Sequence, residues 1–427
     1  MGVGEGDIAA DEHVGIQPRD PWRLRFWAIF GGQALSLLGS ALTQFVLIWW
    51  ITDKIGQISV LGVSGAAAML PLALLGPLGG VIADRYDRQT IMAVTDVLSA
   101  ACMLILVVLF QAERVELWHL YTVLAARSGL TAFQQPAASA CVAMLVPKSF
   151  IPRAAGLNQI LQGATIVGAA PLGALAMSLM PVGWALGIDI LTAVLGVAPL
   201  LIFTIPQPST CHARGKSIWH QFQEGVKTIW QFPGIRALYG LITLTVFVVM
   251  PLFTLLPLLV KEYFEGGAEE VAIFESLAGV GMILGGAVVA IIAPRRYVIW
   301  ILGGFSVACF MMAAIPAVPR QWILCAALIG GLSSMLQIMG NSMFVALIQE
   351  VIPNQVQGRA FSLLTALTGL ATPLGLITLV SPLGEWIGVR LLFIVLGTVA
   401  GVMLFCGFLS SSIRELDFCK NKANSVA

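Results

Sequence analysis

Long uninterrupted apolar runs alternate with short polar segments along this chain. Twelve of these runs contain the roughly 20 helical residues that a hydrocarbon core about 30 Å thick requires. They lie at about residues 26–51, 59–83, 91–111, 118–144, 155–179, 184–205, 237–260, 272–293, 297–317, 322–348, 361–382 and 388–411. A membrane-spanning strand needs only about 9–11 residues of alternating polarity, so these runs must satisfy their backbone hydrogen bonds as helices. The pattern predicts an all-α membrane protein with twelve transmembrane helices.

The composition supports this prediction, and the loop charges predict the orientation of the protein in the membrane. Charged residues make up 11% of the chain, against about 25% in soluble domains. Of the 23 Lys and Arg residues, 17 lie in the two terminal segments and in the loops on the same side of the helices. Because basic residues collect on the cytoplasmic side, both termini are predicted to be cytoplasmic. Residues 1–22 contain no apolar core or cleavage site typical of a signal peptide, so the first helix is expected to direct insertion.

The two halves of the chain resemble each other at an offset of 206 residues. Gly79 aligns with Gly285, and Arg153 aligns with Arg359. A duplicated unit of six helices explains these matches, and such parallel repeats are typical of secondary transporters with a site between the two bundles. The predicted segments are a cytoplasmic tail at 1–22, a six-helix bundle at 23–205, a cytoplasmic loop at 206–236, a second six-helix bundle at 237–412 and a cytoplasmic tail at 413–427.

A cluster of charge interrupts the apolar pattern between the second and third runs. The segment "GGVIADRYDRQ" resembles the loop between helices 2 and 3 of the major facilitator superfamily, roughly G-x-x-x-D-R-x-G-R-R/K. The matching residues are Gly80, Asp84, Arg85 and Arg88, whereas Asp87 replaces a Gly and Gln89 replaces a basic residue. "RSGLTAF", from Arg127, resembles the fourth-helix motif of that superfamily. "GATIVGAAPLG" resembles a loosened form of the fifth-helix motif of its antiporters.

A second resemblance covers nearly the whole chain. Segments such as "LPLALLGPLGGVIADRYDR" and "ALIQEVIPNQVQGRAFSLL" are similar to the bacterial macrolide-efflux branch, which groups with siderophore exporters. The resemblance implies a major facilitator fold in a bacterial inner membrane and proton-driven export of a bulky amphipathic drug. A siderophore exporter of the same fold and an importer or facilitator remain alternatives, because a fold does not identify a substrate.

Ionisable residues inside the apolar runs are candidates for coupling transport to protons, since burying each in a bilayer costs at least about 2.5 kcal/mol. Arg127 lies well inside the fourth run and matches a motif whose Arg is linked to proton movement in the superfamily. Asp189 and Glu275 each lie about five residues from the outer end of their runs. Asp96 lies near the cytoplasmic end of the third run, where pairing with the adjacent loop arginines is the expected role.

Polar and adaptable side chains suggest where a substrate binds. Gln33, Ser36, Ser40 and Gln44 are spaced by three or four residues, which puts them on one helix face. The resemblance implies that helices 1, 4, 7 and 10 line a central cavity. Met and Phe suit irregular apolar ligands, although the same spacing also fits plain helix packing. The candidates beyond that face are Gln134, Phe247, Met250, Phe253, Met335, Met339, Asn341 and Met343.

The charge cluster also suggests a gate on the cytoplasmic side. In the superfamily the loop between helices 2 and 3 reaches the start of helix 11, and "QGRAF" puts Arg359 at that start. A cation at a helix N-terminus faces the positive end of the macrodipole, which is unfavourable unless an anion lies near. We expect Asp84 to be that anion and to pair with Arg359, and Arg85, Asp87 and Arg88 to hold the loop by further charge contacts.

Other functional classes have weaker support. The four His residues lie outside the runs or at their edges, so no compact catalytic set forms within the membrane and an enzyme is not expected. Cys211 and His212 have no metal-ligand spacing, so neither a metal nor a cofactor is predicted. The net charge of +1 indicates no nucleic-acid partner. The predicted partners are the small-molecule substrate, protons and the bilayer, with the chain acting as a monomer.

Overall fold

A computed structural model describes residues 22–203, 205, 233–292, 296–352 and 354–414. Within these ranges it contains twelve α-helices of 18 residues or more. They are α1 Trp22–Lys54, α2 Ile58–Arg85, α3 Arg88–Gln111, α4 Leu117–Leu145, α5 Ile151–Leu179, α6 Val182–Ile202, α8 Pro233–Glu262, α9 Ala268–Ile292, α10 Tyr297–Ala314, α11 Ile323–Val351, α12 Asn354–Gly375 and α13 Ser381–Cys406. Most of the predicted terminal segments and most of the central loop, including Cys211 and His212, lie outside the described residues.

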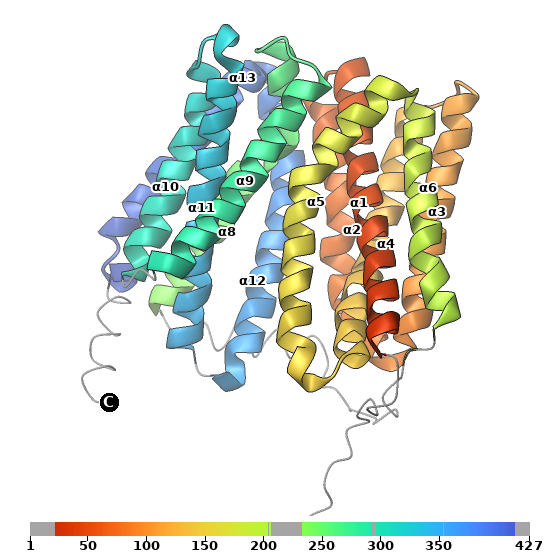
Figure 1. The fold of residues 1–427 in the computed structure, drawn as a ribbon. Coiled ribbons are helices and arrows are strands. Elements are labelled where there is room, and N and C mark those ends of the chain that lie inside the picture. The colour runs from red at the N-terminus through yellow and green to blue at the C-terminus, as the bar shows by residue number, and fades with distance from the viewer. Residues whose placement is uncertain (1–21, 204, 206–232, 293–295, 353, 415–427) are drawn as a thin grey trace, which may run out of the picture.

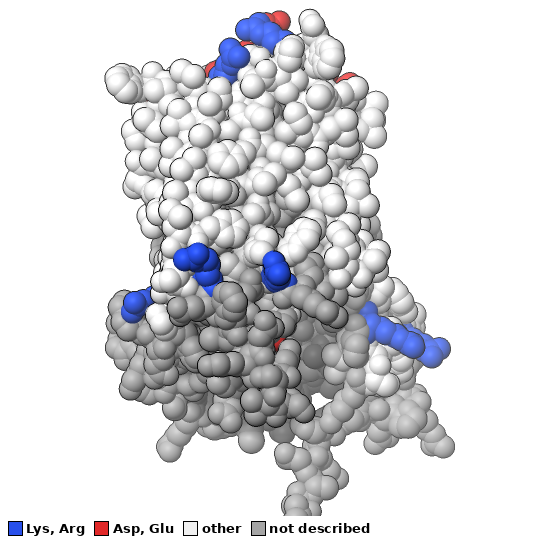
Figure 2. Space-filling view, turned by 90° about the vertical axis from the view of Figure 1, so that its left-hand side faces the viewer, with Lys and Arg blue, Asp and Glu red and all other residues white. Residues whose placement is uncertain are grey.

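The helices form two bundles side by side, α1–α6 and α8–α13 (Figure 1). The prediction of an all-α membrane fold with twelve helices is therefore confirmed. By length and composition, ten segments of the described chain are apolar enough to cross a membrane, and the last of them, Ala360–Leu409, covers most of α12 and all of α13. Helix α4 is not among the ten, since Arg127 and two adjacent glutamines lower its hydropathy. On the face shown in Figure 2, a band of uncharged residues separates basic residues below from charged residues at the top.

The two bundles pack helices in the same way at positions 206 residues apart. A Cβ on Gly79 of α2 would lie 1.9 Å from the carbonyl oxygen of Ala132 on α4. A Cβ on Gly285 of α9 would lie 2.3 Å from Cγ2 of Ile338 on α11. Gly285 follows Gly79 by 206 residues, and Ile338 follows Ala132 by the same offset. Each bundle thus uses a glycine at the same position to bring the same two helices into contact.

Several helix boundaries differ from those predicted. Helix α8 begins at Pro233 rather than at 237, and α12 begins at Asn354 rather than at 361. The apolar pattern misses these starts because their first turns are polar and extend beyond the hydrophobic run. Gly388 has a φ of +79° inside α13 and interrupts the helix near the start predicted for the twelfth run. Glycine adopts this left-handed conformation without the strain of a Cβ.

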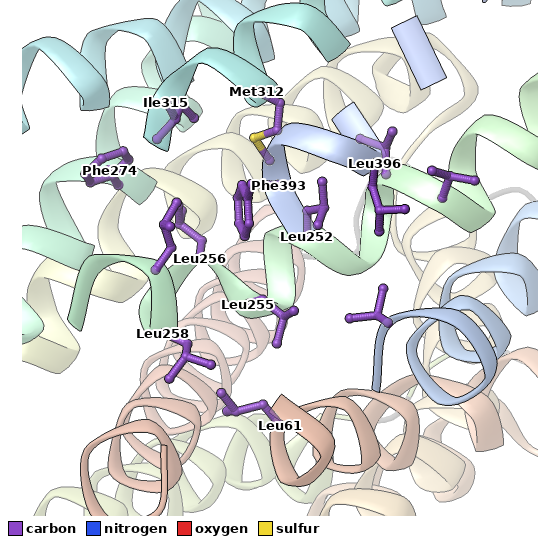
Figure 3. Close-up of a cluster of buried hydrophobic side chains, with 14 of the residues drawn as sticks. Leu61, Leu252, Leu255, Leu256, Leu258, Phe274, Met312, Ile315, Phe393 and Leu396 are labelled. Carbon is purple, nitrogen blue, oxygen red and sulfur yellow. The ribbon is translucent and has the colours of Figure 1, made fainter. Parts of the chain in front are cut away.

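The two bundles are in contact at the end of the molecule opposite the start of α1. Following the orientation predicted from loop charge, we call this end outer and the other end inner. Leu61 of α2 is fully buried and lies near Leu255 and Leu258 of α8 (Figure 3). Beside it, a Cβ on Gly62 would lie 2.2 Å from Oγ of Ser381 on α13. We call this apolar contact, centred on Leu61 and α8, the outer seam.

Candidate functional site

A cavity of about 690 Å³ lies inside the first bundle. Its lining comes from α1 to α6, and it extends from the helix centres to the inner ends at Phe26, Leu145 and Ile151. Among the described residues, the outer seam is closed, whereas this cavity reaches the inner ends of its helices.

The polar face predicted on the first helix lines this cavity. Gln33, Ser36, Ser40 and Gln44 of α1 all contribute to its wall, as does Gln134 of α4. Leu37 and Ala41 alternate with them, so polar and apolar groups are interspersed along the same wall. This surface can bind a molecule that carries both kinds of group.

An ion pair lies in the cavity wall at the level of Ser40. Arg127 Nη2 of α4 lies 2.9 Å from Asp189 Oδ2 of α6, and the two side chains are 13% and 2% exposed. The Ser40 hydroxyl of α1 donates a hydrogen bond of 2.7 Å to the other oxygen of Asp189. Residues of α1 and α4 thus hold a buried carboxylate of α6. Removing one partner of a buried pair leaves an uncompensated charge, at a cost of about 3–5 kcal/mol.

Asp96 of α3 has different partners from those expected. The Gln33 amide donates a hydrogen bond of 2.9 Å to Asp96 Oδ2, and the Gln134 amide donates to Oδ1. The expected pairing with loop arginines is therefore wrong. Arg88 lies two helical turns away along α3 and donates instead to the Ala83 carbonyl at the end of α2, at 3.0 Å.

Comparison with known proteins identifies the family of this chain. The model of the Major Facilitator Superfamily matches residues 29–376. The chain belongs to the Major Facilitator Superfamily. It is 31% identical over 403 residues to macrolide efflux protein A of Streptococcus pyogenes, covering 93% of this chain and 98% of that relative. It is 25% identical to the multidrug efflux pump Tap of Mycobacterium tuberculosis over 402 residues, covering 90% of this chain and 92% of that protein. These relationships indicate a transporter of the efflux type and not an enzyme.

Solved structures of this superfamily share the fold. The nucleoside transporter NupG matches with a TM-score of 0.69 at 12% identity, over 91% of this chain and 99% of that structure. A bacterial homologue of the human lysosomal transporter Spinster, in an inward-facing and unoccupied conformation, also matches with a TM-score of 0.69, at 16% identity. That match covers 94% of this chain and 98% of the Spinster homologue. At these identities the likeness concerns the superfamily fold alone.

Hydrogen bonds of Asp87 and Arg88 contribute to holding the loop between α2 and α3. Asp87 caps α3 by accepting from the backbone N–H groups of Gln89 and Thr90, at 3.3 and 3.1 Å. The expected charge contact of Asp87 is therefore a helix cap, which sequence spacing alone could have indicated. Arg85 is exposed. The side chains of the predicted gate pair, Asp84 and Arg359, lie outside the described part of the molecule.

Arg359 does not lie at the N-terminus of its helix, where it was expected. Because α12 begins at Asn354, Arg359 lies in the second turn and not at the start of the helix. The macrodipole acts mainly within the first turn, so it does not provide the electrostatic reason for an acidic partner.

The candidates in the second bundle lie away from this cavity. Met339 and Met343 of α11 are 3% and 5% exposed, which makes them part of the bundle interior. Phe247 and Phe253 of α8 pack against the hydrophobic core. Met250 and Met335 are half-buried, and Asn341 is exposed. None of these seven residues lines the described cavity.

Glu275 lies on α9 near the contact with the first bundle. The next residue, Ser276, donates a hydrogen bond of 3.3 Å to the Val167 carbonyl of α5. Glu275 is partly buried and has no hydrogen-bond or ion-pair partner among the described residues. It is separate from the cavity that Arg127, Asp189 and Asp96 share.

Several cavity residues escaped the sequence interpretation. Thr131, Gln135 and Ser139 of α4 follow a spacing of four residues and line the cavity, as do Asn158 and Gln162 of α5. The helical spacing of polar residues in an apolar run, which identified the polar face of the first helix, would have found these two sets as well.

Proposed function

We propose that this chain is a secondary active exporter that moves a bulky amphipathic molecule of the macrolide type out of a bacterial cell, driven by protons. The names of two relatives, a macrolide efflux protein and a multidrug efflux pump, support the substrate class. The observation that carries the mechanism is the buried pair of Arg127 and Asp189 in the cavity wall. We further propose that both termini are cytoplasmic and that the chain acts as a monomer.

In the proposed cycle, substrate enters the cavity from the inner side or the inner leaflet. The bundles then close at the inner ends and open at the outer seam. A proton that reaches Asp189 from the outer side cancels its charge and weakens its attraction to Arg127. Because Asp189 also accepts from Ser40, the proton changes contacts among α1, α4 and α6 together. Protonation therefore biases the return to the inward-open arrangement.

Accumulation of a radiolabelled macrolide in an efflux-deficient strain tests the function. Cells that express the chain should accumulate less erythromycin than control cells, and a protonophore should abolish the difference. Undiminished export after both the proton and the sodium gradients have collapsed would exclude the antiporter mechanism. Unchanged accumulation of erythromycin would exclude the macrolide and favour the alternative substrate, a siderophore, whose release into the medium is measured with the same strain.

The Asp189→Asn variant tests the coupling role in proteoliposomes. The amide keeps the size and polarity of the side chain but cannot exchange a proton. We expect this variant to retain substrate exchange at equal pH and to lose transport driven by a pH gradient. The matched control is Glu269→Gln, the same chemical change at an exposed position of α9. If Asp189→Asn responds to the pH gradient as the parent does, coupling resides elsewhere, and Glu275→Gln is the next variant.

The cytoplasmic gate between Asp84 and Arg359 stays a proposal on geometric grounds. A Cβ on Gly369 of α12 would lie 3.7 Å from Cβ of Ala73 on α2, so these helices pack together there. Asp84 follows Ala73 by eleven residues, and Arg359 precedes Gly369 by ten. At about 1.5 Å per residue, both lie about 15 Å closer to the inner end. A double-mutant cycle of Asp84→Asn and Arg359→Gln, read as cysteine accessibility of the inner entrance, should give a coupling energy of about 0.5–3 kcal/mol. Strictly additive effects would exclude the gate.

A further inference from the structure

The cavity wall contains two carboxylates with different electrostatic partners. Asp189 pairs with Arg127, whereas Asp96 accepts hydrogen bonds from two uncharged amides and forms no ion pair with any described Lys or Arg. Arg127, Asp96 and Asp189 are the charged residues of the described lining, so its formal charge is −1. A carboxylate taken out of water without a cation carries a large free-energy penalty. The unpaired charge of Asp96 therefore makes a cation the favoured ligand.

The groups around Asp96 leave room for such a ligand to bind. Gln33 and Gln134 use their amide nitrogens on the carboxylate, and their side-chain oxygens accept no hydrogen bond from a described residue. A carboxylate can accept about four hydrogen bonds, and Asp96 accepts two from these amides. The amides thus fix the carboxylate and add two further acceptors beside it. The carboxylate and these amide oxygens can accept hydrogen bonds from a ligand that carries an N–H group.

The partly exposed ring of Phe30 lines the same cavity on the inner side of Asp96, whereas Phe26 is fully buried. Phe30 lies one helical turn before Gln33 on α1, and its ring stacks on Phe26 at a centroid distance of 5.3 Å. Ring faces attract organic cations and bury their apolar substituents. Along α1 the distance from Gln33 to Ser40 is about 10 Å, at about 1.5 Å per residue, so Asp96 forms a subsite separate from the Arg127–Asp189 pair.

We propose that Asp96, held by Gln33 and Gln134, is the subsite for the positively charged group of the substrate. The substrate class is then the cationic amphiphiles, such as lipophilic amines and quaternary ions. This inference rests on the proposed export function and narrows it. An anionic chelate of the siderophore kind would put its negative charge against Asp96, so the subsite opposes that alternative.

Binding of radiolabelled tetraphenylphosphonium to the purified full chain in detergent tests the subsite. We expect saturable binding by the parent and by Glu269→Gln, which changes an exposed acid. Asp96→Asn should weaken binding by about tenfold to hundredfold, the range expected for loss of a charge-assisted contact. Asp96→Glu keeps the charge and should retain most of the affinity. Neutral triphenylphosphine oxide, added as competitor, should displace the probe much less effectively than unlabelled tetraphenylphosphonium.

The outcomes separate the subsite from the export function. The subsite is refuted if the parent does not bind the probe, if the neutral competitor is as effective as the cation, or if Asp96→Asn binds with parental affinity. Thermal unfolding of each variant shows whether a loss of binding reflects misfolding. If Asp96→Asn is misfolded, Asp96→Glu and Gln33→Leu test the subsite instead. Retained affinity in Asp96→Glu with reduced affinity in Gln33→Leu supports the subsite. Lost affinity in Asp96→Glu, or parental affinity in Gln33→Leu, refutes it. Erythromycin accumulation in cells is scored independently, so its failure refutes the export function.

Discussion

Lys261 joins the two bundles at the outer end, and its removal should favour the outward-open arrangement. Its ammonium group, at the end of α8, donates a hydrogen bond of 3.1 Å to the Thr52 carbonyl and another to the Asp53 carbonyl of α1. It also lies 3.4 Å from Asp53 Oδ1. Because α1 ends at Lys54, these carbonyls belong to the last turn, which has no intrahelical donors and carries the negative end of the macrodipole.

The energy of this contact follows from its exposure. The side chains of Lys261 and Asp53 are 33% and 45% exposed, so the ion pair itself contributes only about 0.2–1 kcal/mol. The interaction of the cation with the helix end adds about 0.3–1 kcal/mol. Lys261→Met keeps the aliphatic stem and removes both terms. We therefore expect the equilibrium to shift toward the outward-open arrangement by about 0.5–2 kcal/mol, or about 2- to 30-fold. Asp53→Asn leaves the backbone acceptors in place and should have the smaller effect.

Cysteine labelling at the outer seam measures this shift. In a cysteine-free background, Leu61→Cys puts a thiol at a fully buried position that becomes accessible when the seam opens. Its rate of reaction with an impermeant maleimide added outside then reports the open population. Lys54→Met is the matched control, since among the described residues Lys54 forms an ion pair with Asp53 of its own helix, at 3.8 Å, and none with the second bundle. Equal labelling rates for Lys261→Met, Lys54→Met and the parent would refute the reasoning.

Two predictions concern stability and are read from thermal unfolding in detergent. Gly79→Val puts a Cβ within 1.9 Å of the Ala132 carbonyl oxygen and should lower the free energy of unfolding by about 1–3 kcal/mol. The control Gly80→Val, with nothing within 4 Å of its Cβ, should be close to neutral, and equal melting temperatures would contradict the close helix contact. Asp87→Ala removes the cap of α3 and should lower the free energy of unfolding by about 1 kcal/mol. Arg85→Ala, at an exposed position two residues earlier, should not change the melting temperature. A larger effect of Arg85→Ala than of Asp87→Ala would exclude capping as the dominant role of Asp87.

The transmembrane helices could be predicted because a bilayer requires long apolar runs, and each run reports its own helix. The polar face from Gln33 to Gln44 could also be predicted, since helical spacing decides which side chains share a face. The boundary of α12 could not, because its first turns are polar and lie beyond the apolar run.

The partners within the cavity could not be read from the sequence. Arg127 and Asp189 lie 62 residues apart on different helices, and their contact depends on how α4 and α6 are rotated. For Asp96, nearness along the chain favoured the loop arginines, but the helix directs its side chain toward α1 and α4 instead. The spacing of Met339 and Met343 fits a cavity wall and a packed interior equally well, and their burial decides for the interior in this arrangement.

The two bundles share a close glycine contact at equivalent positions but differ in the charge of their residues. Gly79 and Gly285 make equivalent close contacts, but the positions equivalent to the three cavity charges are uncharged in the second half. These equivalents of Asp96, Arg127 and Asp189 are Leu302, Ser333 and Val395. A proton or a cationic substrate in the cavity thus meets charges of the first bundle, while α8 supplies the apolar side of the outer seam. In the proposed cycle, the charge changes arise on residues of α3, α4 and α6, and the second bundle moves against the first in response. Lys261 of the second bundle binds the end of α1. The same helix contributes Gln33 and Ser40 to the two acidic sites, so a movement of α1 would change the contacts of Lys261 as well as those of Asp96 and Asp189.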